Sequence, residues 1–109
     1  MPLTHRQVDA AVVVEISGRL AGRDSDQMES LVKDLLAGGG RKFVFDMSSL
    51  EYTDSMGVGA MVACLTRIRR TGGELRLACA KPRVQHILAL TGVDKLVVCY
   101  PTVDDAVAG

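Results

Sequence analysis

The sequence lacks the features on which several common classes of protein depend. It has no Trp and only two Phe and two Tyr, too few aromatic rings for a base-stacking surface or a sugar platform. Basic and acidic residues both number 13, so the net charge is zero. We therefore expect no direct binding to nucleic acid or to an anionic membrane through overall charge. The longest apolar runs, residues 12–14 and 96–99, are far too short to span a bilayer.

Cysteine is also scarce, and its spacing indicates no metal or redox chemistry. Cys64, Cys79 and Cys99 are odd in number and form no C-x-x-C pair, which argues against a zinc ribbon or a redox disulfide. Each stands in an apolar run, so we expect three small buried thiols. The amino-terminal residues lack the apolar core of a signal peptide, and this predicts a cytoplasmic protein. No metal or cofactor is expected.

What is present is the composition of an ordinary globular domain, 48% apolar and 24% charged over 109 residues. This predicts one domain, residues 1–109. Strands are predicted near residues 4–8 and at 11–18, 42–47, 74–79 and 95–99. Helices are predicted at 24–37, 55–70, 82–90 and 101–108. Because strands alternate with helices after the first hairpin, we expect an α/β fold whose later strands run mostly parallel.

Periodicity and end signals define the helices. The first has apolar residues at helical spacing, and Asp24, Ser25 or Asp26 is expected to cap its start. In the second helix, a stripe predicted to face the sheet consists of Val58, Met61, Val62, Leu65 and Ile68. The opposite side of that helix would then present Met56, Ala60 and Cys64 to a partner.

The segment from residue 46 to 59 is the most informative, because it leaves a strand, crosses a polar loop and enters a helix at Ser55. Ligands of open α/β sheets often bind at such junctions. As an N-cap, Ser55 would accept a hydrogen bond from a backbone N–H of the first turn. An exposed Ser55 could equally carry a phosphate, which suits the positive end of a helix and would add to the charge of Asp54. The two roles are compatible, and Gly57 and Gly59 would allow close approach to this turn.

Enzyme motifs are mostly missing. The sequence has no G-x-S-x-G, no Walker G-x-x-x-x-G-K and no H-E-x-x-H. Its two histidines, His5 and His86, are expected at the surface, and Asp46 is expected to cap a strand end rather than to bind a cation. Asp54 and Ser55 alone form a weak nucleophile pair. We therefore expect a protein that is not an enzyme and has no catalytic residue.

Residues 54–59 (DSMGVG) resemble the phosphorylation motif of the anti-sigma factor antagonists, bacterial members of the STAS domain family. The similarity extends to residues 16–20 (ISGRL), the strand at 43–47 with its Asp46, residues 72–75 and residues 91–93. It implies a mixed, mostly parallel sheet of four to five strands with about four helices. It also implies partner switching, in which the unphosphorylated antagonist binds an anti-sigma factor that is a serine kinase. By match of motif, the kinase would phosphorylate Ser55, beside Asp54, and a serine phosphatase would reverse this.

Two departures from the family pattern concern the expected partner surface. Family members often have an acidic residue directly after the Gly-x-Leu piece, in a loop that commonly helps to contact the kinase. Here that place is Ala21, and the nearest acid is Asp24. Met56 stands where many relatives have a second Ser or Thr, which supplies a flexible apolar contact instead. The expected partner-binding residues are Asp54, Ser55, Met56, Gly57, Ala21 and Asp24.

Two other functions remain open at this point. Related domains serve as scaffolds or bind nucleotides or lipids, so the chain could be a small-ligand module of a signalling complex. An enzyme that uses Asp54 and Ser55 is the second alternative.

Overall fold

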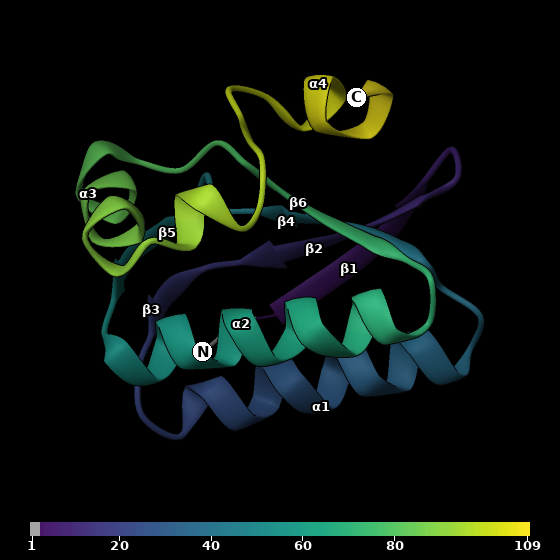
Figure 1. The fold of residues 1–109 in the computed structure, drawn as a ribbon, viewed down its shortest axis with the longest axis horizontal. Coiled ribbons are helices and arrows are strands. Elements are labelled where there is room, and N and C mark those ends of the chain that lie inside the picture. The colour runs from purple at the N-terminus through teal and green to yellow at the C-terminus, as the bar shows by residue number, and fades with distance from the viewer. Residues whose placement is uncertain (1–2) are drawn as a thin grey trace.

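The computed structural model describes residues 3–109 and contains two sheets and four α-helices within that range (Figure 1). The strands are β1 (Leu3–Val8), β2 (Ala11–Ile16), β3 (Gly18–Leu20), β4 (Lys42–Asp46), β5 (Leu50–Thr53), β6 (Glu74–Ala78) and β7 (Cys99–Tyr100). The helices are α1 (Asp24–Ala37), α2 (Ser55–Arg70), α3 (Pro82–Thr91) and α4 (Val103–Ala108), with a 3-10 helix η1 (Val93–Lys95).

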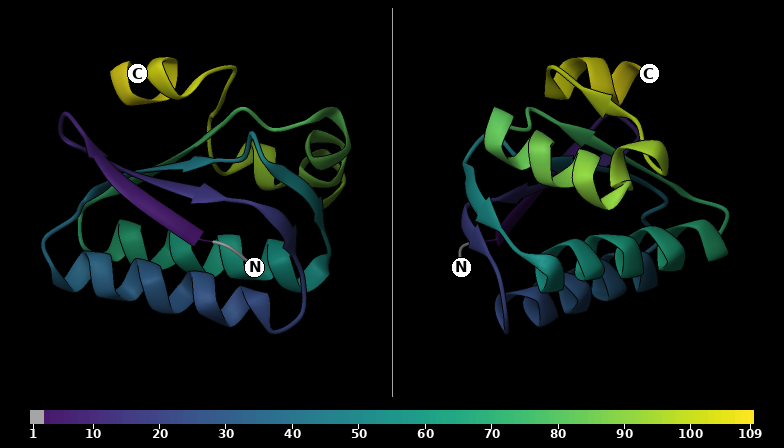
Figure 2. Two further views of the ribbon diagram at one scale, coloured as in Figure 1. Left: turned by 180° about the vertical axis from the view of Figure 1, so that it is seen from behind. Right: turned by 60° about the vertical axis from the view of Figure 1, so that its left-hand side comes forward.

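The main sheet has the order β1-β2-β4-β6-β7, in which only β1 is antiparallel to its neighbour. This confirms the predicted mixed, mostly parallel sheet of five strands with four helices. A second, two-stranded sheet pairs β3 with β5 in parallel. Helices α1 and α2 cover one face of the main sheet and α4 covers the other, while α3 lies beside β5 (Figures 1 and 2).

Alternation along the central strand explains the two layers. In β4, Phe43 and Phe45 belong to the large core beneath α1 and α2, whereas Val44 belongs to the small core beneath α4. Helix α4 is too short to be stable alone, and two cations hold its last turn. Lys42 Nζ donates to the Val107 carbonyl at 2.5 Å, and Arg76 Nη1 donates to the Ala106 carbonyl at 2.9 Å.

The predicted strand at 95–99 is wrong, because only Cys99 of that range is in a strand. Gly92 has a left-handed backbone (φ 78°) that ends α3 and starts a tight turn. The amides of Lys95 and Leu96 then bond back to the carbonyls of Gly92 and Val93. These backbone groups are therefore unavailable to a sheet, although the valine-rich run is typical of a strand.

The predicted strand at 11–18 and the polar loop before Ser55 also need correction. Strand β2 ends at Ile16, and Gly18, at φ 75°, turns the chain into β3. Part of the supposed loop, Leu50–Thr53, is β5, which pairs with β3. At the start of α1, Arg23 occupies the N-cap position and its side chain makes no capping hydrogen bond, so the cap position predicted at Asp24, Ser25 or Asp26 is wrong.

Candidate functional site

Ser55 is the first residue of α2, and Asp54 is its N-cap. The Asp54 backbone is extended (φ −125°, ψ −171°), and its Oδ1 accepts a hydrogen bond from the Gly57 N–H at 2.9 Å. The prediction of Ser55 as the cap is therefore wrong by one residue. Because a neighbouring carboxylate caps the helix, the Ser55 hydroxyl is not needed for that role, and the Ser55 side chain is exposed.

Gly57 fixes the start of α2 against the end of β3. A Cβ placed on Gly57 would lie 2.1 Å from Thr53 Oγ1 and 2.3 Å from the Leu20 carbonyl oxygen. Thr53 is buried, and its hydroxyl donates to that same carbonyl at 2.9 Å. Leu20 O, Thr53 Oγ1 and Gly57 together form what we call the Leu20 contact. Gly57 itself is buried, so it shapes the site from within.

The Leu20 contact brings the two predicted halves of the partner surface to one end of the molecule. Leu20 ends β3 and leads directly into Ala21 and the turn that begins α1, where the Asp24 amide bonds to the Ala21 carbonyl at 3.1 Å. The starts of α1 and α2 lie side by side (Figures 1 and 2). Ala21 and Asp24 are both half-buried, whereas Ser55 is exposed. The sequence-predicted residues are thus close together, with Gly57 beneath the surface.

Met56 is the only large apolar residue of α2 that is exposed, at 59% of its full area. The expectation that Ala60 and Cys64 also point outward is wrong, because they are only 3% and 0% exposed. They face α1, which packs along α2. Because both the sheet and α1 cover α2, the buried stripe of α2 is wider than contact with the sheet alone would make it. The stripe predicted to face the sheet is buried as expected, except that Val62 is half-buried.

Arg19 and Tyr52 adjoin this surface and were not predicted. They are register partners in β3 and β5, and the Arg19 guanidinium carbon lies 4.3 Å from the centre of the Tyr52 ring. This is a cation–π contact on the outer face of the small sheet. This contact could be predicted from the sequence only if the β3–β5 pairing were known, because the two residues are far apart in the chain.

The three cysteines and Asp46 are the remaining candidate groups, and they show little sign of chemical reactivity. Cys64 is buried, and burial, followed by the charge of Glu29, raises the pKa of its thiol to about 12. Cys79 is half-buried and Cys99 is exposed, so the expectation of three buried thiols holds fully only for Cys64 and is wrong for Cys99. In its apolar run, Val97 is in the large core, whereas Leu96 and Val98 are exposed. Asp46 accepts from the Ser48 amide at 3.0 Å, which confirms it as a strand-end cap.

Two findings bear on metals and membranes. Across residues 3–109, no group of three or more His, Cys, Asp or Glu side chains is placed to hold a metal ion. Within the same range, every helix is too short or too polar to cross a bilayer. His5 and His86 are both exposed, as predicted.

Comparison with known proteins identifies the family. A model of the STAS domain family matches residues 3–106. The chain is similar to BtrV of Bordetella bronchiseptica, which is named among the anti-sigma factor antagonists, with 26% identity over 92 residues that make up 84% of this chain and 79% of BtrV. The crystal structure of a Thermotoga maritima protein with the same designation superposes with a TM-score of 0.91 and 27% identity over 97% of this chain and 92% of that one. The phosphorylated form of Bacillus SpoIIAA has the same fold, with a TM-score of 0.76 at 17% identity over 98% and 97% of the two chains. The protein therefore belongs to the STAS domain family.

Proposed function

We propose that this protein is an anti-sigma factor antagonist that switches partners through phosphorylation of Ser55. Unphosphorylated, it binds an anti-sigma factor that is a serine kinase, and the freed sigma factor directs transcription. The kinase phosphorylates Ser55 and the complex dissociates; a serine phosphatase restores the binding form. These events are expected in the bacterial cytoplasm. The observation that carries the proposal is an exposed serine at the first helical position, beside an exposed Met56, in a turn that Asp54 already caps.

Charge supplies the physical basis of the switch. A phosphate on Ser55 adds roughly 1.5 to 2 negative charges at neutral pH, next to the carboxylate of Asp54. The positive end of α2 tolerates this charge in the free protein. A partner that packs on Met56 would have to desolvate the phosphate, and losing one fully desolvated contact can cost about 2 kcal/mol. Two such losses would weaken binding about a thousandfold.

Burial favours Ser55 over the neighbouring hydroxyl groups. Thr53 is 1% exposed and its hydroxyl is bonded to Leu20, so a kinase could reach it only after local unfolding. Ser49 is exposed but precedes β5, and its carbonyl accepts from the Gly18 amide. A phosphate on Ser49 would lack the helix dipole that stabilises one on Ser55.

The test combines phosphorylation mapping with binding. The protein is incubated with ATP and the candidate anti-sigma factor kinases of its own genome, and the modified residue is mapped by mass spectrometry. Ser55→Ala should accept no phosphate and bind the cognate kinase constitutively, whereas Ser55→Asp should bind at least tenfold more weakly than wild type. Ser49→Ala is the matched control and should behave like wild type.

Two outcomes would overturn the proposal: a phosphate mapped to Ser49, or Ser55→Asp binding the kinase as tightly as wild type. The enzymatic alternative is tested separately with serine-directed covalent reagents and an esterase screen. Asp54 Oδ1 is committed to the Gly57 amide, so we expect both tests to be negative.

A further inference from the structure

We propose that the cavity between α3 and the β6–β7 edge of the sheet is a binding site for a small organic cation, a primary ammonium group on a compact apolar body. The site is separate from Ser55 and does not depend on the proposed switch. It has a volume of about 580 Å³. This lies within the range of roughly 300–1,000 Å³ that is usual for small-molecule sites.

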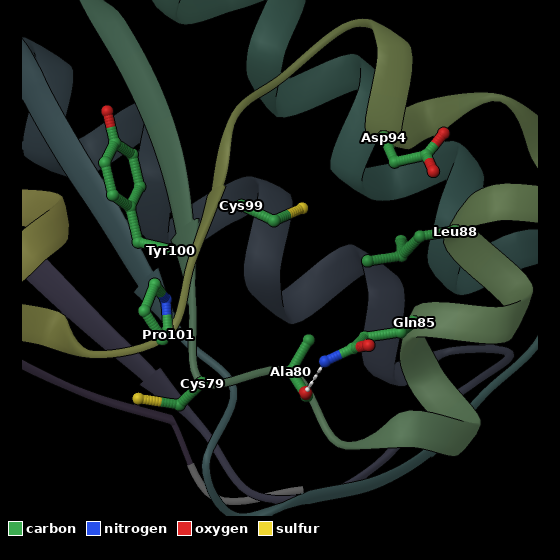
Figure 3. A pocket seen from close by; sticks show the side chains of 8 residues that line it. All are labelled: Cys79, Ala80, Gln85, Leu88, Asp94, Cys99, Tyr100 and Pro101. Atoms are coloured by element: carbon green, nitrogen blue, oxygen red, sulfur yellow. Dashed lines mark hydrogen bonds between the residues drawn. The ribbon is translucent and has the colours of Figure 1, made fainter.

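The place of the cavity in the fold is one where open sheets commonly bind ligands. Cys79 and Ala80 directly follow β6, and Pro101 directly follows β7, so the cavity opens at the carboxyl ends of two parallel strands. Helix α3 forms the opposite wall through Leu88 and Gln85 (Figure 3). The walls therefore come from elements that hydrogen bonding and core packing hold in place.

The polar groups of the cavity favour a positive ligand. Asp94 contributes a carboxylate, and the lining contains no Lys, Arg or His. Gln85 donates its amide N–H to the Ala80 carbonyl at 2.7 Å, which leaves its amide oxygen as an acceptor. Lys81, which follows the lining residue Ala80, is paired with Glu51 on β5. An ammonium group would meet acceptors here, whereas a phosphate or carboxylate would meet Asp94 without a compensating charge.

The remaining lining suits a small apolar body. The Cys99 thiol points into the space bounded by Leu88, Asp94 and Ala80, while the Cys79 sulfur and the Tyr100 ring point away from it (Figure 3). Cys99 is exposed as a residue, but partial desolvation of its thiol, followed by the charge of Asp94, raises the thiol pKa, so it lines the cavity as a neutral, polarisable group. The cavity thus has one charged side and one apolar side.

The experiment uses three probes that share a phenyl body and differ in charge: 2-phenylethylammonium, 2-phenylethanol and 3-phenylpropanoate. Each is titrated into the ¹⁵N-labelled full chain while amide chemical shifts are followed. The ammonium probe should give saturable shifts at residues 79–80, 85, 94 and 99. The alcohol should bind about fivefold more weakly, because an exposed ion pair is worth up to about 1 kcal/mol. The propanoate should shift none of these amides.

Two variants connect the binding to the cavity. Asp94→Asn should weaken the ammonium probe about fivefold and leave the alcohol unaffected, whereas the matched control Asp26→Asn, on exposed α1 surface across the sheet, should change neither. Cys99→Phe should fill the cavity and abolish binding of the ammonium probe while the spectrum stays well dispersed. The proposal is overturned if the ammonium probe gives no saturable shifts, if Asp94→Asn binds it like wild type, or if 3-phenylpropanoate shifts the same amides.

Discussion

Replacing Gly57 with alanine is the most direct test of how the end of β3 and the start of α2 are joined. The new Cβ would lie 2.1 Å from Thr53 Oγ1 and 2.3 Å from the Leu20 carbonyl oxygen, well inside van der Waals contact. The Thr53 hydroxyl could rotate away, but the Leu20 oxygen is backbone and can move only with β3 itself. Relief of the clash therefore requires the first turn of α2 to shift away from β3.

The cost can be worked out from two terms. Overpacking of a close-packed site typically costs about 1–3 kcal/mol. If the hydroxyl of Thr53 leaves the Leu20 carbonyl, a buried acceptor loses its partner, at about 1–3 kcal/mol more. We expect Gly57→Ala to lose about 3 kcal/mol, part of a total that is about 5–15 kcal/mol in small proteins. The variant should fold, with a midpoint of thermal unfolding lower by about 12 °C.

Gly59→Ala is the matched control, because it lies in the same helix and a Cβ there would meet nothing within 4 Å. Alanine is a better helix former than glycine, so this variant should gain up to about 1 kcal/mol. Urea unfolding of both variants, followed by circular dichroism, measures the difference. If Gly57→Ala is as stable as Gly59→Ala, the Leu20 contact does not constrain the site and our reading of it is incorrect.

Three further predictions concern single groups. A neutral thiol reagent at pH 8, followed by peptide mapping, should label Cys99 first and Cys64 only after unfolding, because Cys64 is buried and its pKa of about 12 keeps it protonated. Asp54→Ala should lower the free energy of unfolding, measured with urea, by about 1 kcal/mol because the N-cap is lost. Asp54→Asn should keep most of that stability because asparagine can also cap a helix. Equal losses in the two variants would exclude capping as the role of Asp54. A double-mutant cycle on Arg19→Ala and Tyr52→Leu should give a coupling of about 0.5 kcal/mol, and a coupling of zero would show that the cation–π contact has no energetic weight.

The sequence predicts best the elements whose signal is local. The α2 stripe, the glycine stop at Gly92 and the start of α3 at Pro82 each depend on residues within one or two turns, and the structure confirms them. The polar loop that leads into an apolar helical pattern places a helix start at Ser55, which the structure also confirms. The same pattern assigned the cap to the wrong one of two adjacent polar residues, because either side chain can cap and only the backbone angles decide between them.

The elements that the sequence does not predict, strands β3 and β5, depend on contacts between distant segments of the chain. Strands β3 and β5 are three and four residues long, are separated in the chain by helix α1 and strand β4, and neither shows a clear alternation. Their pairing alone explains why Arg19 lies on Tyr52 and why Gly57 must be glycine. Neither fact could be inferred from residues 16–20 and 50–57 taken separately, since the steric demand at Gly57 arises from the Leu20 carbonyl.

The Leu20 contact also bears on how a phosphate on Ser55 would act. A phosphate can exclude the partner directly where it is attached, or it can change the shape of a surface that the partner contacts elsewhere. Gly57 leaves no room for the first turn of α2 to approach β3, and the buried Thr53 hydroxyl is already bonded, so these contacts resist a shift of that turn. We therefore expect phosphorylation of Ser55 to act directly, by charge and bulk at the surface.

This expectation can be measured on the free protein. In ¹⁵N-labelled chain phosphorylated at Ser55, amide shifts should be confined to residues 54–59 and the adjacent loop at 21–24, and exchange protection of β3 and α1 should be unchanged. Amide shifts that spread through α1 or along β4 would instead indicate that the surface is remodelled. The Leu20 contact would then rearrange on phosphorylation. Comparison with Ser55→Asp separates charge from size, because aspartate supplies one negative charge in a smaller volume. If charge at the surface is the cause, both forms should perturb the same amides, and the phosphate should perturb them more.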